Sequence, residues 1–351
     1  MLSDPIGLVW LLAIALVTFG VSAVATYVLS RGLVPFLRIL DHPNARSLHA
    51  IPVPRTGGVA VIVAIAVGLS LAEIASDLPP AMGWLLAAAA PIAIISLLDD
   101  WRGVPVRARL VAQLGSAILL VIAGLSWNGP WLPGNSLTPP PWLAPVLMVL
   151  FIVWMINLYN FMDGMDGLAG GMAVFGFGAL ALLGWQNGNV PYLLVNGIFC
   201  ASALGFLTGN FPPARIFLGD LGSALLGLLA AVMILWGTRA GVMGFWTGAL
   251  AFSPFIVDAT WTLLSRATRG ERLWEAHRSH HYQRLVLAGW SRRRVLARAY
   301  LLMAAAAACA VAAPRLHGSE QWMLLAGWAM IYWLAHLRVE HSVRTASGIA
   351  R

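Results

Sequence analysis

The carboxylates of Asp163 and Asp166 and the carboxamides of Asn157 and Asn160 are the side chains whose position most needs a chemical explanation. They end a hydrophobic run with the spacing NxxNxxDxxD, and a glycine follows each aspartate. Polar groups at the end of an apolar run are costly. Glycine lets a backbone leave a helix and approach a ligand closely. Asp-Gly pairs also mark ordinary turns, so this segment alone fits a turn or a binding site.

Asp99 and Asp100 are adjacent carboxylates that close another hydrophobic run. Such a pair repels unless a cation or a proton lies between its members. Carboxylate oxygens suit Mg²⁺, which usually keeps several waters and shares the phosphates of a substrate. The alternative is an acidic helix end in water, paired with a neighbouring arginine. Arg107 and Arg109 follow, and they could grip a phosphate by bidentate contacts or serve only as positive residues beside a membrane.

A third acidic position, Asp220, stands at the start of a hydrophobic run. Its carboxylate could be another oxygen ligand for a metal, or only the cap of a helix. Phe217, three residues earlier, could be a core residue or a stacking platform for a base. The spacing decides neither question.

Three histidines, His277, His280 and His281, fall within five positions of a segment with eight arginines between 266 and 294. A basic segment beside a membrane commonly binds anionic lipid. The histidines exceed that need and suit a diphosphate, a metal or a proton, although no nearby cysteine supports zinc. A proline-rich loop near 41–58 carries Arg46 and Arg55, which we expect to contact an anion.

Composition identifies the class of protein that must position these groups. The chain is 60% hydrophobic and 10% charged, whereas soluble domains carry about 25% charged residues. We therefore predict an all-α, polytopic integral membrane protein with 10 or 11 transmembrane helices and a single domain over residues 1–351. Eleven apolar runs approach the roughly 20 residues that a bilayer requires. They lie near 6–29, 58–76, 81–98, 110–126, 142–159, 169–185, 191–208, 219–237, 245–264, 296–313 and 321–337.

Arginine sets the expected orientation. With a periplasmic N-terminus, the inner loops are 30–57, 99–109, 160–168, 209–218 and 265–295, and 20 of the 22 arginines fall on these loops, their flanks or the C-terminal tail. The acids and histidines gather at the same face. A transporter would place its acids near the bilayer midplane, whereas only Asp258 lies well inside a span here. An acid inside a span can mark a functional site, but we interpret Asp258 as a polar contact that fixes a bend beside Pro254. Clustering at one face predicts an enzyme with one soluble and one lipid-borne substrate.

Five motifs occur in order between Asp41 and Arg294: DxPNxRxxHxxPxPRxGG, DD, NxxNxxDGxDGLA, FxGDxGS and the histidine-rich loop. Together they resemble the polyprenyl-phosphate N-acetylhexosamine-1-phosphate transferases, the family of MraY, WecA and WbpL. One such motif alone would be a weak signal. The pattern HRSHHYQ and the first loop look most like the WbpL branch, which starts O-antigen chains, rather than the MraY enzymes of peptidoglycan synthesis.

The resemblance implies Mg²⁺-dependent transfer of a sugar 1-phosphate from a UDP-N-acetylhexosamine to undecaprenyl phosphate, with release of UMP and with Mn²⁺ as an alternative metal. It implies that Asp220, with Asp99 and Asp100, holds the metal and that Asp99 is favoured to deprotonate the lipid phosphate. It also implies that Asn210, Asp163 and Asp166 line the nucleotide site and that Phe217 stacks on uracil. The implied catalytic residues are Asp99, Asp100, Asp163, Asp166, His280 and His277. The implied substrate-binding residues are Asn160, Asn210, Phe217, Arg107, Arg109, Arg46, Arg55, His281 and Asn157.

The same resemblance implies a multi-pass protein of the bacterial inner membrane, in contact with membrane lipid and not with nucleic acid, and it is compatible with a homodimer. UDP-GlcNAc is the default donor for the wider family, and the 6-deoxy donors UDP-QuiNAc and UDP-FucNAc fit the WbpL branch. A transporter for a lipid-linked or nucleotide sugar and a non-catalytic scaffold with the same fold are the alternatives from other functional classes.

Overall fold

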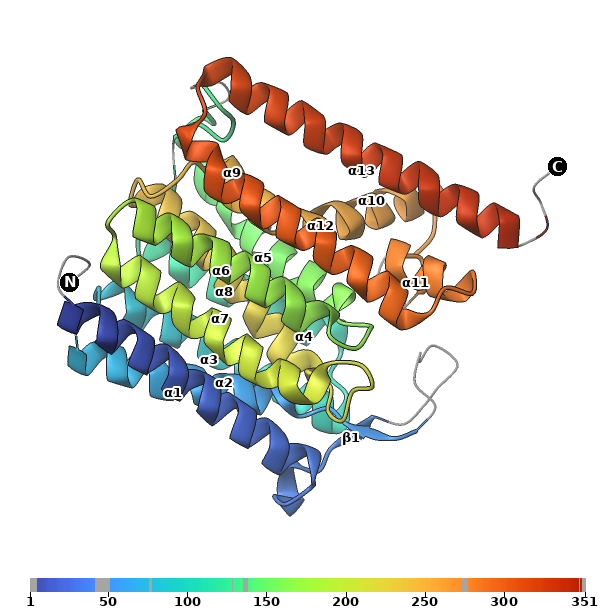
Figure 1. Ribbon diagram of the computed structural model, residues 1–351, viewed down its shortest axis with the longest axis horizontal. Helices are drawn as coiled ribbons and strands as arrows, with labels where there is room; N and C mark the ends of the chain where they lie inside the picture. Colours follow the sequence, from blue (N-terminus) through green and yellow to red (C-terminus); the bar gives the residue numbers. More distant parts are fainter. Residues whose placement is uncertain are drawn as a thin grey trace.

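The computed structural model describes residues 5–41, 51–75, 78–127, 129–134, 138–272, 277–346 and 348. Most of them belong to α-helices packed in a bundle, with α1 at one edge and α13 at the other (Figure 1). The prediction of a helical, polytopic fold is confirmed in this general form. The helices are α1 (Pro5–Ser30), α2 (Gly57–Ala75), α3 (Ala81–Arg102), α4 (Val106–Ile122), α5 (Ala144–Met162), α6 (Leu168–Gln186), α7 (Val190–Asn210), α8 (Gly219–Arg239), α9 (Phe245–Ala251), α10 (Ser253–Thr268), α11 (His281–Leu287), α12 (Arg292–Ala312) and α13 (Gly318–Ala346).

Each of the eleven predicted apolar runs lies on a helix or on the bent pair α9 and α10. In the described ranges, eight helices are long and apolar enough to cross a bilayer, and the number is nine if the bent pair is one span rather than a re-entrant loop. The other two runs lie on α4 and α13. Helix α4 has 17 residues, which at about 1.5 Å per residue falls short of a hydrocarbon core of about 30 Å. The count of eleven spans therefore stays a prediction.

Helix α8 occupies the centre of the bundle, and nearly all of it is buried. It packs against α2, α3, α5, α6 and α9. Gly58 of α2 lies against Gly222 of α8, and Gly227 of α8 lies against the backbone of Met155, so that a Cβ at any of these glycines would meet neighbouring atoms. Small residues let helices approach this closely in a membrane. The start of α8, which carries Asp220, is therefore fixed between the ends of its neighbours.

The run 245–264, which we counted as one span with a bend beside Pro254, is divided by that bend into two helices. Helices α9 and α10 meet at Phe252 with a bend of 85°. Pro254, in the first turn of α10, has no N–H to donate to the carbonyl of Leu250. The hydroxyl of Ser253 donates to that carbonyl instead, at 2.7 Å. The freed carbonyl is thus satisfied inside the bundle, which makes the break tolerable at membrane depth.

Two short elements lie in segments that we expected to be loops. Strands β1 (Leu40–Asp41) and β2 (Val53–Pro54) pair antiparallel, with Leu40 opposite Pro54 and Asp41 opposite Val53. Helix α11 forms within the basic segment 265–295 and packs against α12 and α13. The all-α prediction did not include the strand pair. Both elements lie at the end of the bundle where we expected the site (Figure 1).

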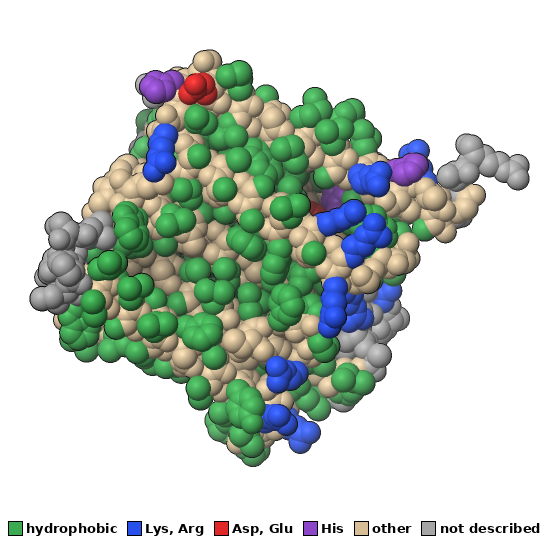
Figure 2. All heavy atoms as spheres, viewed as in Figure 1, with side chains coloured by type: hydrophobic (Ala, Val, Ile, Leu, Met, Phe, Trp, Pro, Cys, Tyr) green, Lys and Arg blue, Asp and Glu red, His purple; other side chains and the backbone are tan. Residues whose placement is uncertain are grey.

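Charge divides the surface of the bundle. Figure 2 shows most basic side chains of this face gathered at the end that carries β1 and α11, while hydrophobic side chains cover much of the rest. A broad apolar surface beside a basic end is the pattern of a protein that spans a membrane with its basic end toward the cytoplasm. The orientation of the basic end relative to the membrane stays a prediction.

Candidate active site

The ends of α3, α4 and α8 bring two aspartates and one arginine together. Nη1 of Arg109 lies 2.7 Å from Oδ2 of Asp99 and 3.1 Å from Oδ2 of Asp220. One guanidinium nitrogen thus serves two carboxylates that are 121 residues apart in the chain. Asp99 is also held by the backbone N–H of Val104, which donates to Oδ1 at 2.6 Å. Because Arg109 is about one-third exposed, an incoming phosphate could compete for its donors.

Asp100, the neighbour of Asp99, has a different environment. It is buried, and its two carboxylate oxygens accept from the backbone N–H groups of Asp220 and Leu221 at 3.2 and 3.1 Å. These are free donors at the start of α8, so Asp100 caps a helix that is distant in sequence. Arg55 lies 3.5 Å from Oδ1 of Asp100 and donates to its backbone carbonyl. Asp220, which we considered as the cap of α8, is thereby left with its carboxylate directed toward Arg109.

Gly219 permits this junction. Its φ angle is +76°, a conformation that residues with a Cβ rarely adopt. A Cβ there would also overlap the carbonyl oxygen of Arg55 and lie 2.9 Å from Oδ2 of Asp100. The glycine of the FxGDxGS motif is therefore required by the close approach of the first loop and α3 to the start of α8.

Asp163 follows the last turn of α5 and is half-buried beside this group. In the described part of the chain, no hydrogen bond to its carboxylate is found. Burial raises the pKa of Asp163 to about 8, and the negative charges of Asp220, Asp100 and Asp166 add to the effect. Such an excess of negative charge favours a bound proton or a cation at this position.

The carboxamides of α5 tie helices together. Asn160 donates to Oγ of Ser223 on α8 at 3.0 Å. Asn157 donates to Oε1 of Gln113 on α4 at 2.7 Å. Ser223 and Gln113 are site neighbours that we did not predict, and only the three-dimensional contact identifies them. Both asparagines hold the ends of α4, α5 and α8 in one cluster.

The residues expected at the nucleotide site hold the loop between α7 and α8. Oδ1 of Asn210 accepts from the N–H of Gly167 at 2.9 Å, and its Nδ2 donates to the carbonyl of Ile216 at 2.8 Å. Oδ2 of Asp166 accepts from the N–H of Ala214 at 3.1 Å. Phe217 is half-buried, and its backbone bonds to Pro54 and Gly57 of the first loop. Asn210 and Asp166 thus have structural partners, which leaves their contact with a nucleotide as a prediction.

The three histidines differ in their surroundings. His277 is half-buried, and burial, followed by the positive charges of His280 and Arg266, lowers its pKa to about 4, so it is neutral at pH 7. His280 is buried, and its ring stacks on Phe161 and Tyr282 with centroid distances of 6.4 and 5.9 Å.

His281 has protein partners on both sides of its ring: Nδ1 lies 2.8 Å from Asp258 and Nε2 lies 3.0 Å from His336. Both ring nitrogens of His281 therefore already contact protein groups, although we had expected His281 to bind substrate.

Asp258 has a partner that we did not expect. The bend lies at Phe252, beside Pro254 as expected, but Asp258 accepts from the N–H of His281 at 3.0 Å and from the hydroxyl of Thr262 at 3.2 Å. Nδ1 of His280 also lies 3.5 Å from the same carboxylate oxygen. The general rule that an acid inside a span is functional could have identified Asp258.

Two predicted anion contacts are not found in the cluster of described residues. Arg107 is exposed, and Arg46 lies outside the described residues. Among the described residues, no three carboxylate, histidine or cysteine groups stand close enough to hold a metal as they are. The half-buried Asp163 and the paired Asp99 and Asp220 nevertheless supply hard oxygen ligands of the type that Mg²⁺ prefers.

Comparison with known proteins gives an independent indication of the family. Residues 82–238, which include α3 through α8, match the model of glycosyl transferase family 4. The chain is 31% identical over 268 residues to a probable undecaprenyl-phosphate N-acetylglucosaminyl 1-phosphate transferase of Bacillus subtilis, covering 75% of this chain and 74% of the relative. It is 31% identical over 317 residues to a phospho-N-acetylmuramoyl-pentapeptide-transferase of Gloeothece citriformis, covering 81% and 83%. It is 29% identical over 319 residues to a decaprenyl-phosphate N-acetylglucosaminephosphotransferase of Mycobacterium leprae, covering 80% and 79%.

Proposed function

The chain belongs to the polyprenyl-phosphate N-acetylhexosamine-1-phosphate transferases of glycosyl transferase family 4, and we propose that it moves N-acetylhexosamine 1-phosphate from a UDP-sugar to undecaprenyl phosphate, with release of UMP. The observation that carries this proposal is the junction at which Arg109 joins Asp99 and Asp220 beside Asp163. It offers one cationic and several anionic groups at a membrane face. Transfer between two phosphates needs chiefly positioning and neutralisation of charge.

Each carboxylate of the junction has its own role in this proposal. Asp100 is a positioning residue, because both of its oxygens hold the start of α8. That leaves Asp220 and Asp163 to hold Mg²⁺, which when bound supplies positive charge to the phosphates of the donor. Asp99 is the base that takes the proton of the lipid phosphate. Its bond from Val104 fixes one oxygen and leaves the oxygen that faces Arg109 available once a phosphate engages the guanidinium.

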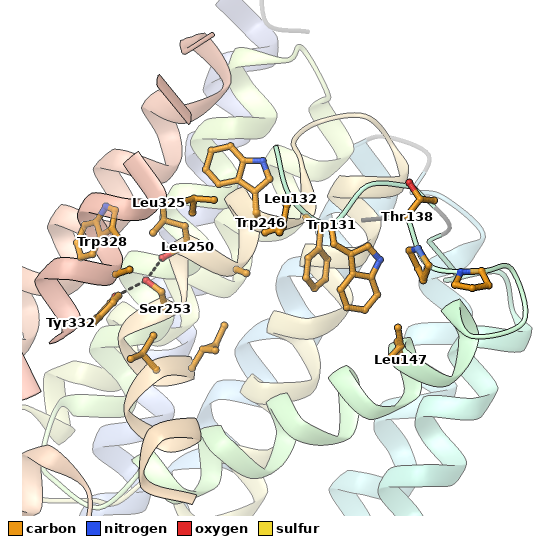
Figure 3. A pocket seen from close by; sticks show the side chains of 17 residues that line it. Trp131, Leu132, Thr138, Leu147, Trp246, Leu250, Ser253, Leu325, Trp328 and Tyr332 are labelled. Atoms are coloured by element: carbon orange, nitrogen blue, oxygen red, sulfur yellow. Dashed lines mark hydrogen bonds between the residues drawn. The ribbon is translucent and has the colours of Figure 1, made fainter. Parts of the chain in front are cut away.

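An apolar pocket of about 760 Å³ suits the polyprenyl tail (Figure 3). It lies between α5, α9, α10 and α13, with Trp131, Trp246, Trp328 and Tyr332 among its lining residues. Its polar contacts include the hydroxyls of Ser253 and Tyr332, which bond to each other at 2.5 Å (Figure 3). Aromatic and aliphatic walls with few polar groups favour a hydrocarbon ligand.

Helix α10 connects this pocket to the candidate site. Ile256 and Val257 line the pocket, and the next residue, Asp258, bonds to His281 of the histidine segment. A chain that lay along α10 would have its tail in the apolar pocket and its phosphate near the histidines. The shared helix thus supports one binding path for a lipid phosphate, from the membrane to the reactive groups.

The protein is a multi-pass membrane protein, and we place its reactive end at the cytoplasmic face of the bacterial inner membrane, where the basic side chains gather. We further propose an O-antigen-initiating role of the WbpL type, with a UDP-N-acetylhexosamine donor. The motif HRSHHYQ supports this branch, in which the spacing of the histidines differs from that of the MraY enzymes. Among the described residues we find no cluster of acidic side chains in the middle of the helices, which is the feature that would favour a transporter.

The test is release of UMP by purified protein in detergent with undecaprenyl phosphate, Mg²⁺ and a panel of UDP-N-acetylhexosamines. We expect release that requires the lipid and stops with EDTA, and the best donor identifies the sugar. Matched reactions without lipid separate transfer from hydrolysis. UMP release of equal rate with and without lipid, or none with any donor from folded protein, would contradict the proposal.

A further inference from the structure

The last helix of the chain contacts the histidine segment directly. Nε2 of His281 lies 3.0 Å from Nδ1 of His336 on α13. On the other side of the ring, Nδ1 of His281 lies 2.8 Å from Oδ1 of Asp258 on α10. The backbone N–H of His281 donates to the same oxygen at 3.0 Å. His281 is therefore held between two helices that are remote from it in sequence.

When the His281 ring is neutral, the hydrogen bonds that run from Asp258 through His281 to His336 fit one order of donors. A carboxylate only accepts, so Nδ1 of His281 carries the proton that faces Asp258. In the neutral ring Nε2 then accepts, and Nδ1 of His336 must donate to it. The His281 ring is thus held at Nε2 by Nδ1 of His336. An alanine at 336 would leave Nε2 of His281 without this partner.

Neighbouring contacts fix His336 and its helix. The ring of His336 packs against Trp261 of α10 at a centroid distance of 4.6 Å. One turn further along α13, Oε1 of Glu340 lies 2.5 Å from Nη1 of Arg284 on α11 and 3.9 Å from Nε2 of His336. The charged and titratable groups around the pair are therefore Asp258 on α10, Arg284 on α11 and Glu340 on α13.

The contact between His281 and His336 reaches the candidate site through the residues that precede His281. His280 is the adjacent residue, and its ring stacks on Phe161 at the end of α5. The rings of His280 and His277 are 4.9 Å apart. A shift of His281 would therefore move the two histidines that face the ends of α5 and α10.

We propose that His336 is a positioning residue, which holds the histidine segment 277–281 in place at the reactive end through its hydrogen bond to His281. The consequence for catalysis rests on the proposed transferase function, and the consequence for the segment itself does not. Helix α13 is then part of the machinery of the enzyme, since it fixes groups that lie near the transferred phosphate.

The test compares four variants for UMP release and for trypsin cleavage. Asparagine can place an amide nitrogen where Nδ1 of histidine stands, whereas glutamine places it near Nε2, so His336→Asn keeps the bond and His336→Gln loses it. Glutamine is close to histidine in volume, whereas asparagine is smaller. His336→Ala removes the side chain, and His341→Ala, at an exposed position of the same helix, is the matched control.

We expect His336→Ala and His336→Gln to lower kcat by about tenfold or more, because small displacements of positioned groups cost this much. His336→Asn and His341→Ala should stay within about threefold of the parent, a span that ordinary surface changes cover. The KM for the UDP-sugar should change less than kcat. Equal kcat in the Asn and Gln variants, or an unchanged kcat in His336→Ala, would overturn the positioning role.

Trypsin tests the anchoring without any substrate, because several arginines lie between 269 and 284. Loss of one hydrogen bond should raise the cleavage rate in this segment by about fivefold in the Ala and Gln variants. His336→Asn and His341→Ala should be cleaved at the parent rate. Equal cleavage in all variants would overturn the proposal even if UMP release were normal. If the parent releases no UMP with any donor, the proposed transferase function is wrong. The cleavage rates still test whether His336 holds the histidine segment.

Discussion

Replacing each of the two adjacent aspartates by asparagine should produce different defects, although the substitutions are chemically identical. Asp100 holds the start of α8 with both oxygens and pairs with Arg55. Asparagine has one carbonyl oxygen, so Asp100→Asn leaves one of the two backbone donors unsatisfied and removes the charge. Asp99 accepts from Val104 with one oxygen, and Asp99→Asn can keep that bond.

The structure gives the sizes of these effects. An unsatisfied buried donor together with a weakened helix cap costs about 2–3 kcal/mol of folding free energy. For a large domain, about 2 °C of melting temperature is lost per kcal/mol, which predicts a decrease of roughly 5 °C for Asp100→Asn. In Asp99→Asn the lost ion pair involves a partly exposed arginine, which limits the cost to about 1 kcal/mol or 2 °C.

Both quantities can be measured on one preparation. The 16 tryptophans of the chain report unfolding in detergent by intrinsic fluorescence, and UMP release gives the activity at a temperature well below melting. Asp99→Asn should lower UMP release by about 100-fold or more, as expected for loss of a general base, with almost unchanged melting. If Asp100→Asn had the melting temperature of the parent while Asp99→Asn had a lowered one, the assignment of Asp100 as the helix cap and Asp99 as the base would be refuted.

Three further outcomes follow from the same junction. Gly219→Ala should prevent recovery of folded protein, because the added Cβ overlaps the backbone of the first loop. The control is Gly103→Ala, which is also at positive φ but in open space and should cost only about 1–2 kcal/mol of folding free energy in a melting comparison. Equal recovery of both variants would contradict the packing argument. Arg109→Gln should abolish most UMP release, whereas Gln at the exposed Arg107 should reduce it little; similar losses would argue against the bridge. In metal-free protein, Asp163 keeps its proton up to pH of about 8 when folded and loses it above about 4 when unfolded, so folding is weakened as the pH rises between these values. The melting temperature of Asp163→Asn should therefore gain on the parent between pH 5 and 8 and not above, and a pH-independent difference would exclude a raised pKa.

The placement of the elements was largely accessible from sequence. Hydrophobic runs of membrane length and the distribution of arginine predicted the helices and the end of the bundle that carries Asp99, Asp163 and Asp220. These signals are local or compositional, and the bilayer strongly restricts the folds that satisfy them. A bend beside Pro254 was expected, but its angle of 85° was not, because a proline in a run of this length is also compatible with a mild kink.

The different roles of Asp99 and Asp100 at the junction could not be predicted from the sequence. Adjacent helical residues point about 100° apart, and which of Asp99 and Asp100 meets the start of α8 depends on the packing of helices that are over 100 residues apart. The same limit applies to Asp258 and His336, whose common partner His281 belongs to a third helix. Periodicity and spacing describe one element at a time, whereas these contacts depend on three.

The most direct measurement of the central claim follows the β-phosphorus of the donor. Purified protein, undecaprenyl phosphate and Mg²⁺ are incubated with a UDP-N-acetylhexosamine that carries ³²P at the β-position, and the lipid and nucleotide products are separated. Transfer of sugar 1-phosphate predicts that the label enters the lipid fraction in equal amount to the unlabelled UMP released. Label that stays in the nucleotide fraction as UDP would show transfer of the sugar alone, which would contradict the account.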